Sequence, residues 1–164
     1  MAIIASKNAS PSERIATAYQ RLTESASHLN IASDELGTSI RALDHALAKL
    51  NLGIKTWIKS GGWENPDSTY EDHHLGYAKV GSKWGIALSV TRGMRGWEED
   101  ATYEGEWLFN DAPRALRAES IDALPELVEA LVQAADETTA KIMDKTAGAK
   151  QLAKTVTALA QVKK

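Results

Sequence analysis

Apolar or small residues recur at alternating spacings of four and three over the first fifty positions of the chain. They are Ile15, Tyr19, Leu22, Ala26, Leu29, Ser33, Leu36, Ile40, Leu43, Leu47 and Leu50. A strict seven-residue repeat keeps one seam of a helix facing a partner and favours a left-handed coiled coil. Ser10 to Glu13 reads as a capping box, and Gly53 is suited to stop a helix. The pattern therefore predicts a helical arm over residues 11–52.

The same rhythm returns at the other end of the chain. Its members are Ile121, Leu124, Val128, Leu131, Ala135, Thr138, Ile142, Ala149, Leu152, Val156 and Leu159, with one interruption at Lys145. Asp111-Ala112-Pro113 predicts the start of a short helix, and Pro125 suits the first turn of a longer one. Residues 111–162 are therefore expected to form a second helical arm. The two arms would bury their seams as an antiparallel pair in one chain or as a bundle across a dimer.

Between the arms the apolar period changes to two, which is typical of strands. Alternation runs over residues 54–60, 75–80 and 84–91, with a fourth strand expected over 103–109. Gly81-Ser82-Lys83 predicts a hairpin between the second and third strands. The centre, residues 53–110, is thus expected to form a four-stranded antiparallel meander with long loops at 61–74 and 92–102. The whole, residues 1–164, is interpreted as one α+β domain.

The third strand would have two different faces. One carries Trp84, Ile86, Leu88 and Val90, and the other carries Gly85, Ala87, Ser89 and Thr91. A face of small residues lets a helix or a ligand approach closely, and a helix is the commoner occupant.

Aromatic residues and glycines are concentrated in this centre. Nine of the ten aromatics, with all five tryptophans, lie between Trp57 and Phe109, and nine of the eleven glycines lie between Gly53 and Gly105. Most of these tryptophans are expected to be packed in a small β core. Trp57 is the exception, because Lys55 and Lys59 flank it on the same strand face. Tryptophan is enriched at binding hot spots, so Trp57 is a contact candidate.

Composition excludes several classes of function. There is no cysteine, hence no disulfide, no thiolate zinc site and no thiol catalysis. The net charge is −3, and the centre, with six basic and nine acidic residues, carries all of this excess negative charge. Bulk nucleic-acid binding needs a basic face and is disfavoured. No apolar run approaches a membrane span, so a soluble cytoplasmic protein without a membrane partner is expected. No motif calls for a cofactor.

Arg114 and Arg117 are the first candidates for ligand binding. They are three residues apart on one helical face, directly after a strand, where helical N–H groups favour anions. The guanidinium of arginine can also make two parallel hydrogen bonds to a phosphate or carboxylate. In the alternative interpretation, these two side chains pair with acidic residues at 98–100 or with Glu104 and Glu106.

Arg92, Arg95 and Trp97 form a second candidate group with two glycines in one segment. Glycines let the backbone approach a ligand, and tryptophan can stack on a base. A mobile surface loop is the simpler interpretation.

A metal site is not expected. Glu71-Asp72-His73-His74 offers metal-binding residue types, but neighbouring residues in extended chain point to opposite sides. No recognised catalytic or nucleotide-binding motif is present. An enzyme would need an acid–base pair such as His74 with Glu71 or Glu106.

Two segments together, LGYAKVGSKWGIALSV and DAPRALR followed by LPELVEAL, resemble a pattern in small bacterial and phage proteins. Those proteins also place a long helix before the strands and another after them. The resemblance implies the architecture over most of the chain, and it implies no activity.

These observations favour a non-catalytic binding protein that forms a homodimer or larger homo-oligomer through its long helices. Its ligand would be an anionic small molecule, such as a nucleotide-type signal sequestered by a phage-type protein, bound where the sheet meets the last helix. The alternative is a protein-interaction adaptor that uses the helical seam and the Trp-bearing sheet face.

Overall fold

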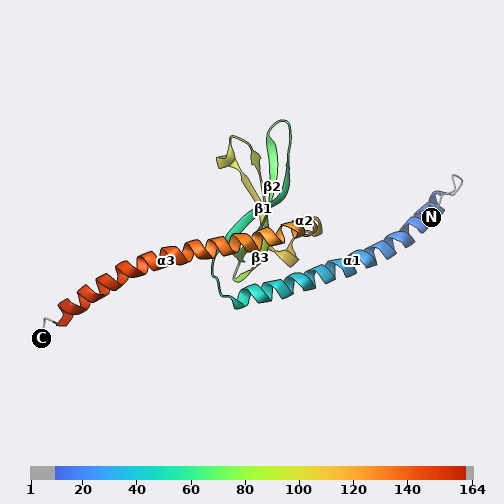
Figure 1. The fold of residues 1–164 in the computed structure, drawn as a ribbon. Coiled ribbons are helices and arrows are strands. Elements are labelled where there is room, and N and C mark those ends of the chain that lie inside the picture. The colour runs from blue at the N-terminus through green and yellow to red at the C-terminus, as the bar shows by residue number, and fades with distance from the viewer. Residues whose placement is uncertain (1–9, 162–164) are drawn as a thin grey trace. The chain divides into compact units, whose positions relative to one another are not determined.

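The computed structural model describes residues 10–161 and confirms an α+β fold (Figure 1). A long helix precedes a four-stranded antiparallel sheet, and a short and a long helix follow it. Contacts divide the chain into two units, residues 1–42 and residues 43–164. The first unit is described only as a helix, and the second holds the last residues of that helix with all the remaining elements.

Helix α1 spans Pro11–Lys49 and begins at the expected capping box. The backbone N–H of Ser10 donates to the Glu13 carboxylate at 2.7 Å, and the N–H of Glu13 donates to the Ser10 hydroxyl at 3.3 Å. The helix ends three residues earlier than the expected boundary at residue 52. Asn51 adopts a left-handed φ of 48°, so the chain leaves the helix before Gly53 is reached.

The sheet has the order β1-β2-β3-β4, as expected of a meander. Its strands are β1 (Thr56–Glu64), β2 (Thr69–Val80), β3 (Lys83–Met94) and β4 (Thr102–Leu108). The expected hairpin at 81–83 is confirmed in position, since Val80 pairs with Lys83. The loops expected at 61–74 and 92–102 are shorter than predicted, since only residues 65–68 and 95–101 lie between the strands. Strands β1, β2 and β3 extend into them, because the polar residues there are matched by charged partners on neighbouring strands and on α2.

Strand register gives the sheet two distinct faces. We call one the aliphatic face: Glu71, His73, Leu75 and Tyr77 of β2 with Ile86, Leu88 and Val90 of β3. We call the other the small-residue face: Asp72, His74, Gly76 and Ala78 of β2 with Gly85, Ala87 and Ser89 of β3.

Helices α2 (Arg114–Ser120) and α3 (Leu124–Gln161) both pack against β1 and β2 (Figure 1). The buried residues of α3, Leu127 and Leu131, lie in its first part. Short 3-10 turns at Glu98–Asp100, Phe109–Asp111 and Ile121–Ala123 complete the fold. The α2 side chain Glu119 reaches His73, so the helical layer covers the aliphatic face. Leu75, Ile86 and Leu88 on that face, and Leu127 of α3, have no exposed surface.

The small-residue face is contacted at one end by the last turns of α1. The Asp44 carboxylate accepts a 2.6 Å hydrogen bond from the backbone N–H of Ile86, and it lies against Gly85. Burial raises the pKa of Asp44, and the Ile86 hydrogen bond opposes that rise in part. The last turns of α1 therefore use part of this face.

The expectation that most tryptophans are packed is wrong. None of the five falls in the buried class, and Trp63, Trp84 and Trp97 are 46%, 40% and 66% exposed. Trp84 stacks on Tyr77 with ring centroids 5.7 Å apart. The buried core is built instead from aliphatic residues with Tyr70, Tyr77 and Phe109, because the sheet is narrow and its tryptophans lie near strand ends and edges.

Both long helices carry exposed arms. Every residue from Ser10 to Ala32 and every residue from Thr139 to Gln161 is exposed. Heptad positions of both arms are among them: Ile15, Tyr19, Leu22, Leu29, Ile142, Leu152, Val156 and Leu159, each 53–69% exposed. None of the helices among residues 10–161 is long and apolar enough to cross a membrane.

Candidate functional site

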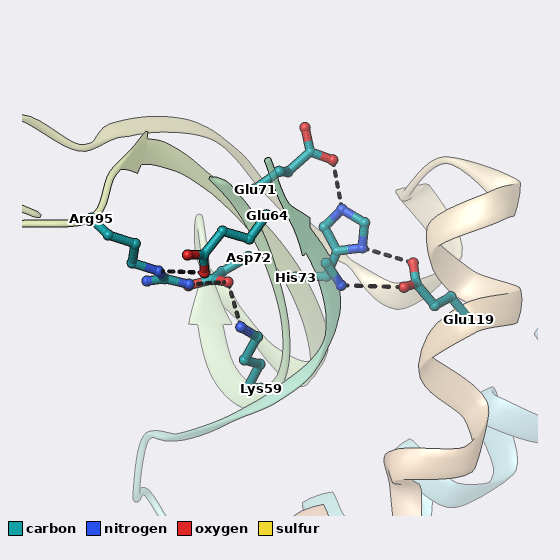
Figure 2. A network of polar contacts seen from close by, with 8 residues as sticks. Lys59, Glu64, Glu71, Asp72, His73, Arg95 and Glu119 are labelled. Carbon is teal, nitrogen blue, oxygen red and sulfur yellow. Dashed lines mark hydrogen bonds and ion pairs between the residues drawn. The ribbon is translucent and has the colours of Figure 1, made fainter. Parts of the chain in front are cut away.

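Strand β2 carries a histidine held between two carboxylates on the aliphatic face (Figure 2). The His73 ring contacts Glu71 through Nε2 at 2.6 Å and Glu119 through Nδ1 at 2.7 Å. Arg92 of β3 donates to the other oxygen of Glu71. Glu119 also accepts from the backbone N–H of Gly62 at 3.3 Å. The group therefore ties α2 to three strands of the sheet.

Burial alone would lower the pKa of His73, but hydrogen bonds to Glu71 and Glu119 and their negative charges outweigh it. The pKa of His73 is raised as a result. The hydrogen bond with His73 lowers the pKa of Glu71, and Arg92 adds to that effect. Every polar atom of the histidine ring is committed to a structural contact. The arrangement is suited to hold an imidazolium and to fix a helix, not to receive a ligand.

Replacing His73 with glutamine should flatten the dependence of stability on pH. The raised pKa of His73 means that its contribution is full below the ordinary value of 6.5 and is lost as pH rises through the raised pKa. The lowered pKa of Glu71 means that its contribution is present above 4.5 and is lost as pH falls. Urea titrations should therefore show wild-type stability declining above pH 6.5, and His73→Gln declining less.

His74→Gln is the matched control. Burial lowers the pKa of His74, so protonation penalises the folded state as pH falls below 6.5. Its removal should raise stability on the acid side and leave the alkaline side unchanged. A wild-type profile that is flat between pH 6.5 and 8.5 would contradict the role given to His73.

A second charge network lies on the small-residue face (Figure 2). Asp72 pairs with Lys59 at 2.6 Å and with Arg95 at 3.0 Å, and Arg95 also reaches Glu64 at 3.1 Å. The Arg95 guanidinium lies 3.7 Å from the centroid of the Tyr70 ring. Burial favours a raised pKa for Asp72, but Lys59 and Arg95 together lower it. Adjacent residues of β2 thus anchor one network on each face.

Beside this network the same face is hollowed, with a volume of about 420 Å³. The lining residues come from all four strands and the residue before β1: Lys55, Trp57, His74, Ser89, Tyr103 and Glu106. We call this the Trp57 hollow. Its floor is a row of cross-strand partners, since His74 pairs with Ser89 and Ser89 with Glu106. Gly76 leaves space for the Trp57 ring, because a Cβ there would lie 2.3 Å from it.

The chemistry of the hollow is mixed. Lys55 Nζ lies 5.8 Å from the centroid of the Trp57 ring, so a cation and an aromatic surface stand together. The Tyr103 hydroxyl donates to Glu106, and burial followed by this contact raises the pKa of Tyr103. The lowered pKa of His74 leaves its ring neutral near pH 7. Neutral histidine offers one donor and one acceptor.

The six residues predicted for ligand binding do not form one site. Arg92 on the aliphatic face pairs with Glu71 and, at 3.8 Å, with Glu104. Arg95 is committed to Asp72 and Glu64 on the other face. Of the remaining four, Arg117 on α2 is 8% exposed, Arg114 and Trp97 are exposed, and Trp57 lines the hollow. The predicted loop at residues 92–97 is also wrong in part, since Arg92, Gly93 and Met94 belong to β3.

No family model, curated protein or solved structure matches this chain. The geometry of the chain itself therefore carries the functional argument. Among residues 10–161, no three potential metal-binding side chains are grouped.

Five residues of the hollow were absent from the predicted binding set: Lys55, His74, Ser89, Tyr103 and Glu106. His74 was weighed as a metal-binding residue type and as an acid or base, not as a contact for a ligand. One signal in the sequence could have predicted part of the lining of the hollow. A two-residue turn at Gly81 and Ser82 sets Val80 opposite Lys83, and counting back along both strands then places His74 opposite Ser89. The hairpin predicted over 81–83 would set His74 opposite Val90, one residue away. Tyr103 and Glu106 depend on the β3–β4 register, which has an irregularity after Val90 and is not readable from the sequence.

Proposed function

We propose that this protein is a non-catalytic binding protein that assembles with a second copy of itself through its long helices. The observation that carries the proposal is the exposure of both helical arms, with heptad positions 53–69% exposed. In proteins, most helical stability comes from burying an apolar face and not from helix propensity. A partner that covers these seams would supply that burial.

Charge along α3 favours an antiparallel pairing of two copies of this helix. Its first part, residues 124–137, has four acidic residues and no basic one. Its second part, residues 138–161, has four lysines and one acidic residue. A parallel pair would set lysines beside lysines, whereas an antiparallel pair sets the lysine-rich part of each copy beside the acidic part of the other.

One row of residues on α3, spaced seven apart, could form the contact between the two helices of an antiparallel pair. Val128, Ala135, Ile142, Ala149 and Val156 are seven residues apart, and Val128, Ile142 and Val156 are 40%, 61% and 63% exposed. An antiparallel pair centred on Ile142 would set Val128 against Val156 and Ala135 against Ala149. The small alanines would let the two helices approach closely between the larger contacts.

Ile142→Asp is expected to weaken self-association by at least tenfold, because it places two carboxylates at the centre of the pair, and tenfold corresponds to about 1.4 kcal/mol. Sedimentation velocity across micromolar concentrations measures this. Ala140→Asp, on the opposite side of the same exposed helical turn, is the matched control and should leave the dissociation constant unchanged. A wild-type monomer at all these concentrations would refute the proposal.

The chain has no cysteine, so engineered thiols report helix orientation directly. An antiparallel pair should form a disulfide between copies when Val128→Cys and Val156→Cys proteins are mixed, and Val156→Cys alone should not. Efficient cross-linking of Val156→Cys alone would overturn the antiparallel arrangement.

A protein-interaction adaptor is the second candidate, favoured by the same exposed seams. In an adaptor, the exposed seams would be covered by a helix of another protein with complementary charge and not by a second copy of this chain. A monomeric wild-type chain whose exposed arms become protected from hydrogen exchange only on adding such a partner would favour the adaptor.

A further inference from the structure

The floor of the Trp57 hollow presents two polar side chains, Ser89 and His74, to anything that enters it. Ser89 is 5% exposed and lines the hollow. Within the described part of the chain, no hydrogen bond involves its hydroxyl or the neighbouring His74 ring. A hydroxyl and a neutral imidazole each offer a donor and an acceptor. Neither side chain holds a buried atom without a partner, so water can reach both groups in the hollow. A ligand that displaces this water must replace its hydrogen bonds, which favours a ligand with donors and acceptors on its edge.

The walls of the hollow supply flat apolar surface around this polar floor. Trp57 stands on β1 at one side, and Tyr103 stands on β4 at the other. Tyr103 is 55% exposed, and its hydroxyl is held by Glu106. An aromatic wall favours a planar ring, because stacking on tryptophan or tyrosine is effective for any π-face. The volume of about 420 Å³ lies within the range of small-molecule sites.

We propose that the Trp57 hollow binds a mononucleotide-class ligand, whose base lies against Trp57 over the polar floor and whose phosphate meets Lys55. The base offers donors and acceptors on its edge to Ser89 and His74. The Glu106 carboxylate can accept from an exocyclic amino group. The Lys55 ammonium lies beside Trp57 and is exposed, so it can pair with a phosphate at the mouth of the hollow.

Other ligand classes use fewer of these features. An apolar aromatic compound would leave the Ser89 hydroxyl and the His74 ring without partners. Inorganic phosphate would meet one lysine of the lining and would be repelled by Glu106. A base with one anionic group uses the aromatic wall, the polar floor and the cation together.

This site is independent of the helical pairing proposed above, since none of its lining residues belongs to α1 or α3. Failure of one proposal is therefore distinguishable from failure of the other. Sedimentation tests the helices, and ligand titration tests the hollow.

The test uses the full chain with the four common 5′-mononucleotides, the matching nucleosides, and inorganic phosphate. At about 100 times its dissociation constant, a bound mononucleotide should raise the Tm by roughly 5–10 °C. The matching nucleoside should bind more weakly, and inorganic phosphate should give no shift. Chromatography of the mixture should recover the nucleotide intact.

Three substitutions locate the site by isothermal titration. Trp57→Ala should weaken binding about 5- to 150-fold through lost stacking. Ser89→Ala, a nearly isosteric change that keeps the fold, should weaken it about 2- to 12-fold. Lys55→Gln should weaken nucleotide binding and leave nucleoside binding unchanged.

Trp63→Ala is the matched control, because Trp63 lies on the same strand, is 46% exposed, and pairs with Glu71 on the aliphatic face. It should bind as the wild type does. The proposal is overturned if no mononucleotide shifts the Tm, if phosphate alone gives the same shift, or if Trp63→Ala weakens binding as much as Trp57→Ala. Conversion of the nucleotide would overturn the non-catalytic function while leaving the site in place.

Discussion

Alanine at position 76 is expected to destabilise the protein by about 1–3 kcal/mol, the usual cost of overpacking. A Cβ on Gly76 would lie 2.3 Å from the Trp57 ring and 2.6 Å from the backbone oxygen of Thr56. The ring can move away, but the backbone oxygen belongs to the paired strand β1 and can move only if the two strands shift apart. The Tm should fall by roughly 2–4 °C for each kcal/mol. Trp57 should also become more exposed, which tryptophan fluorescence would report.

Gly148→Ala is the control for this experiment, because a Cβ at Gly148 in α3 would meet nothing within 4 Å. That change should stabilise the helix by about 0.5–1 kcal/mol. Trp57→Ala combined with Gly76→Ala should recover part of the loss, since one of the two clashes is then removed. A Gly76→Ala protein as stable as the wild type would show that the Trp57 ring does not occupy the space over Gly76.

Leu127→Ala is expected to have the largest effect of any single truncation in α3, about 2–5 kcal/mol. Leu127 has no exposed surface, and it lies in the part of α3 that packs on β1 and β2. Its truncation leaves a cavity beneath the helix as well as losing buried apolar area. Chemical denaturation at one fixed protein concentration is the appropriate measurement, because self-association would add a concentration-dependent term.

Val132→Ala is the matched change on the same helix. Val132 is 58% exposed, so its truncation should alter stability by less than about 0.5 kcal/mol. Equal effects of Leu127→Ala and Val132→Ala would mean that α3 does not dock on the sheet through the Leu127 side. Hydrogen exchange of α3 amides would then be fast in both proteins.

The helices and their starts could be predicted because their signals are local. The capping residues Ser10 and Glu13 contact each other, and the heptad ladders need only sequence spacing. The ends of the strands could not be predicted so well. Residues 69–74 of β2 read as polar loop, yet they form strand because their charges are met by Arg92, Arg95, Lys59 and Glu119, which are distant in sequence.

The candidate site was less predictable for the same reason. Arg92 and Arg95 are of the residue type that binds anions. No local pattern in the sequence reveals that they form ion pairs with Glu71 and Asp72. Trp57 was predicted as a contact residue, and it does line the hollow. Ser89 was assigned correctly to the small-residue face, but its role depends on which residues from β1 and β4 stand around it.

The alternation of Glu71, Asp72 and His73 along β2 also has a consequence for how the chain reaches its fold. A slip of β2 by one residue would turn Glu71 and His73 away from Arg92 and Glu119, and Asp72 away from Lys59 and Arg95. The same slip would move Leu75 and Tyr77 from the aliphatic face to the small-residue face. Both charge networks would be lost at once, with the apolar contacts of the core. The alternation of these residues therefore specifies the register of β2 twice, through charge on both faces and through burial on one.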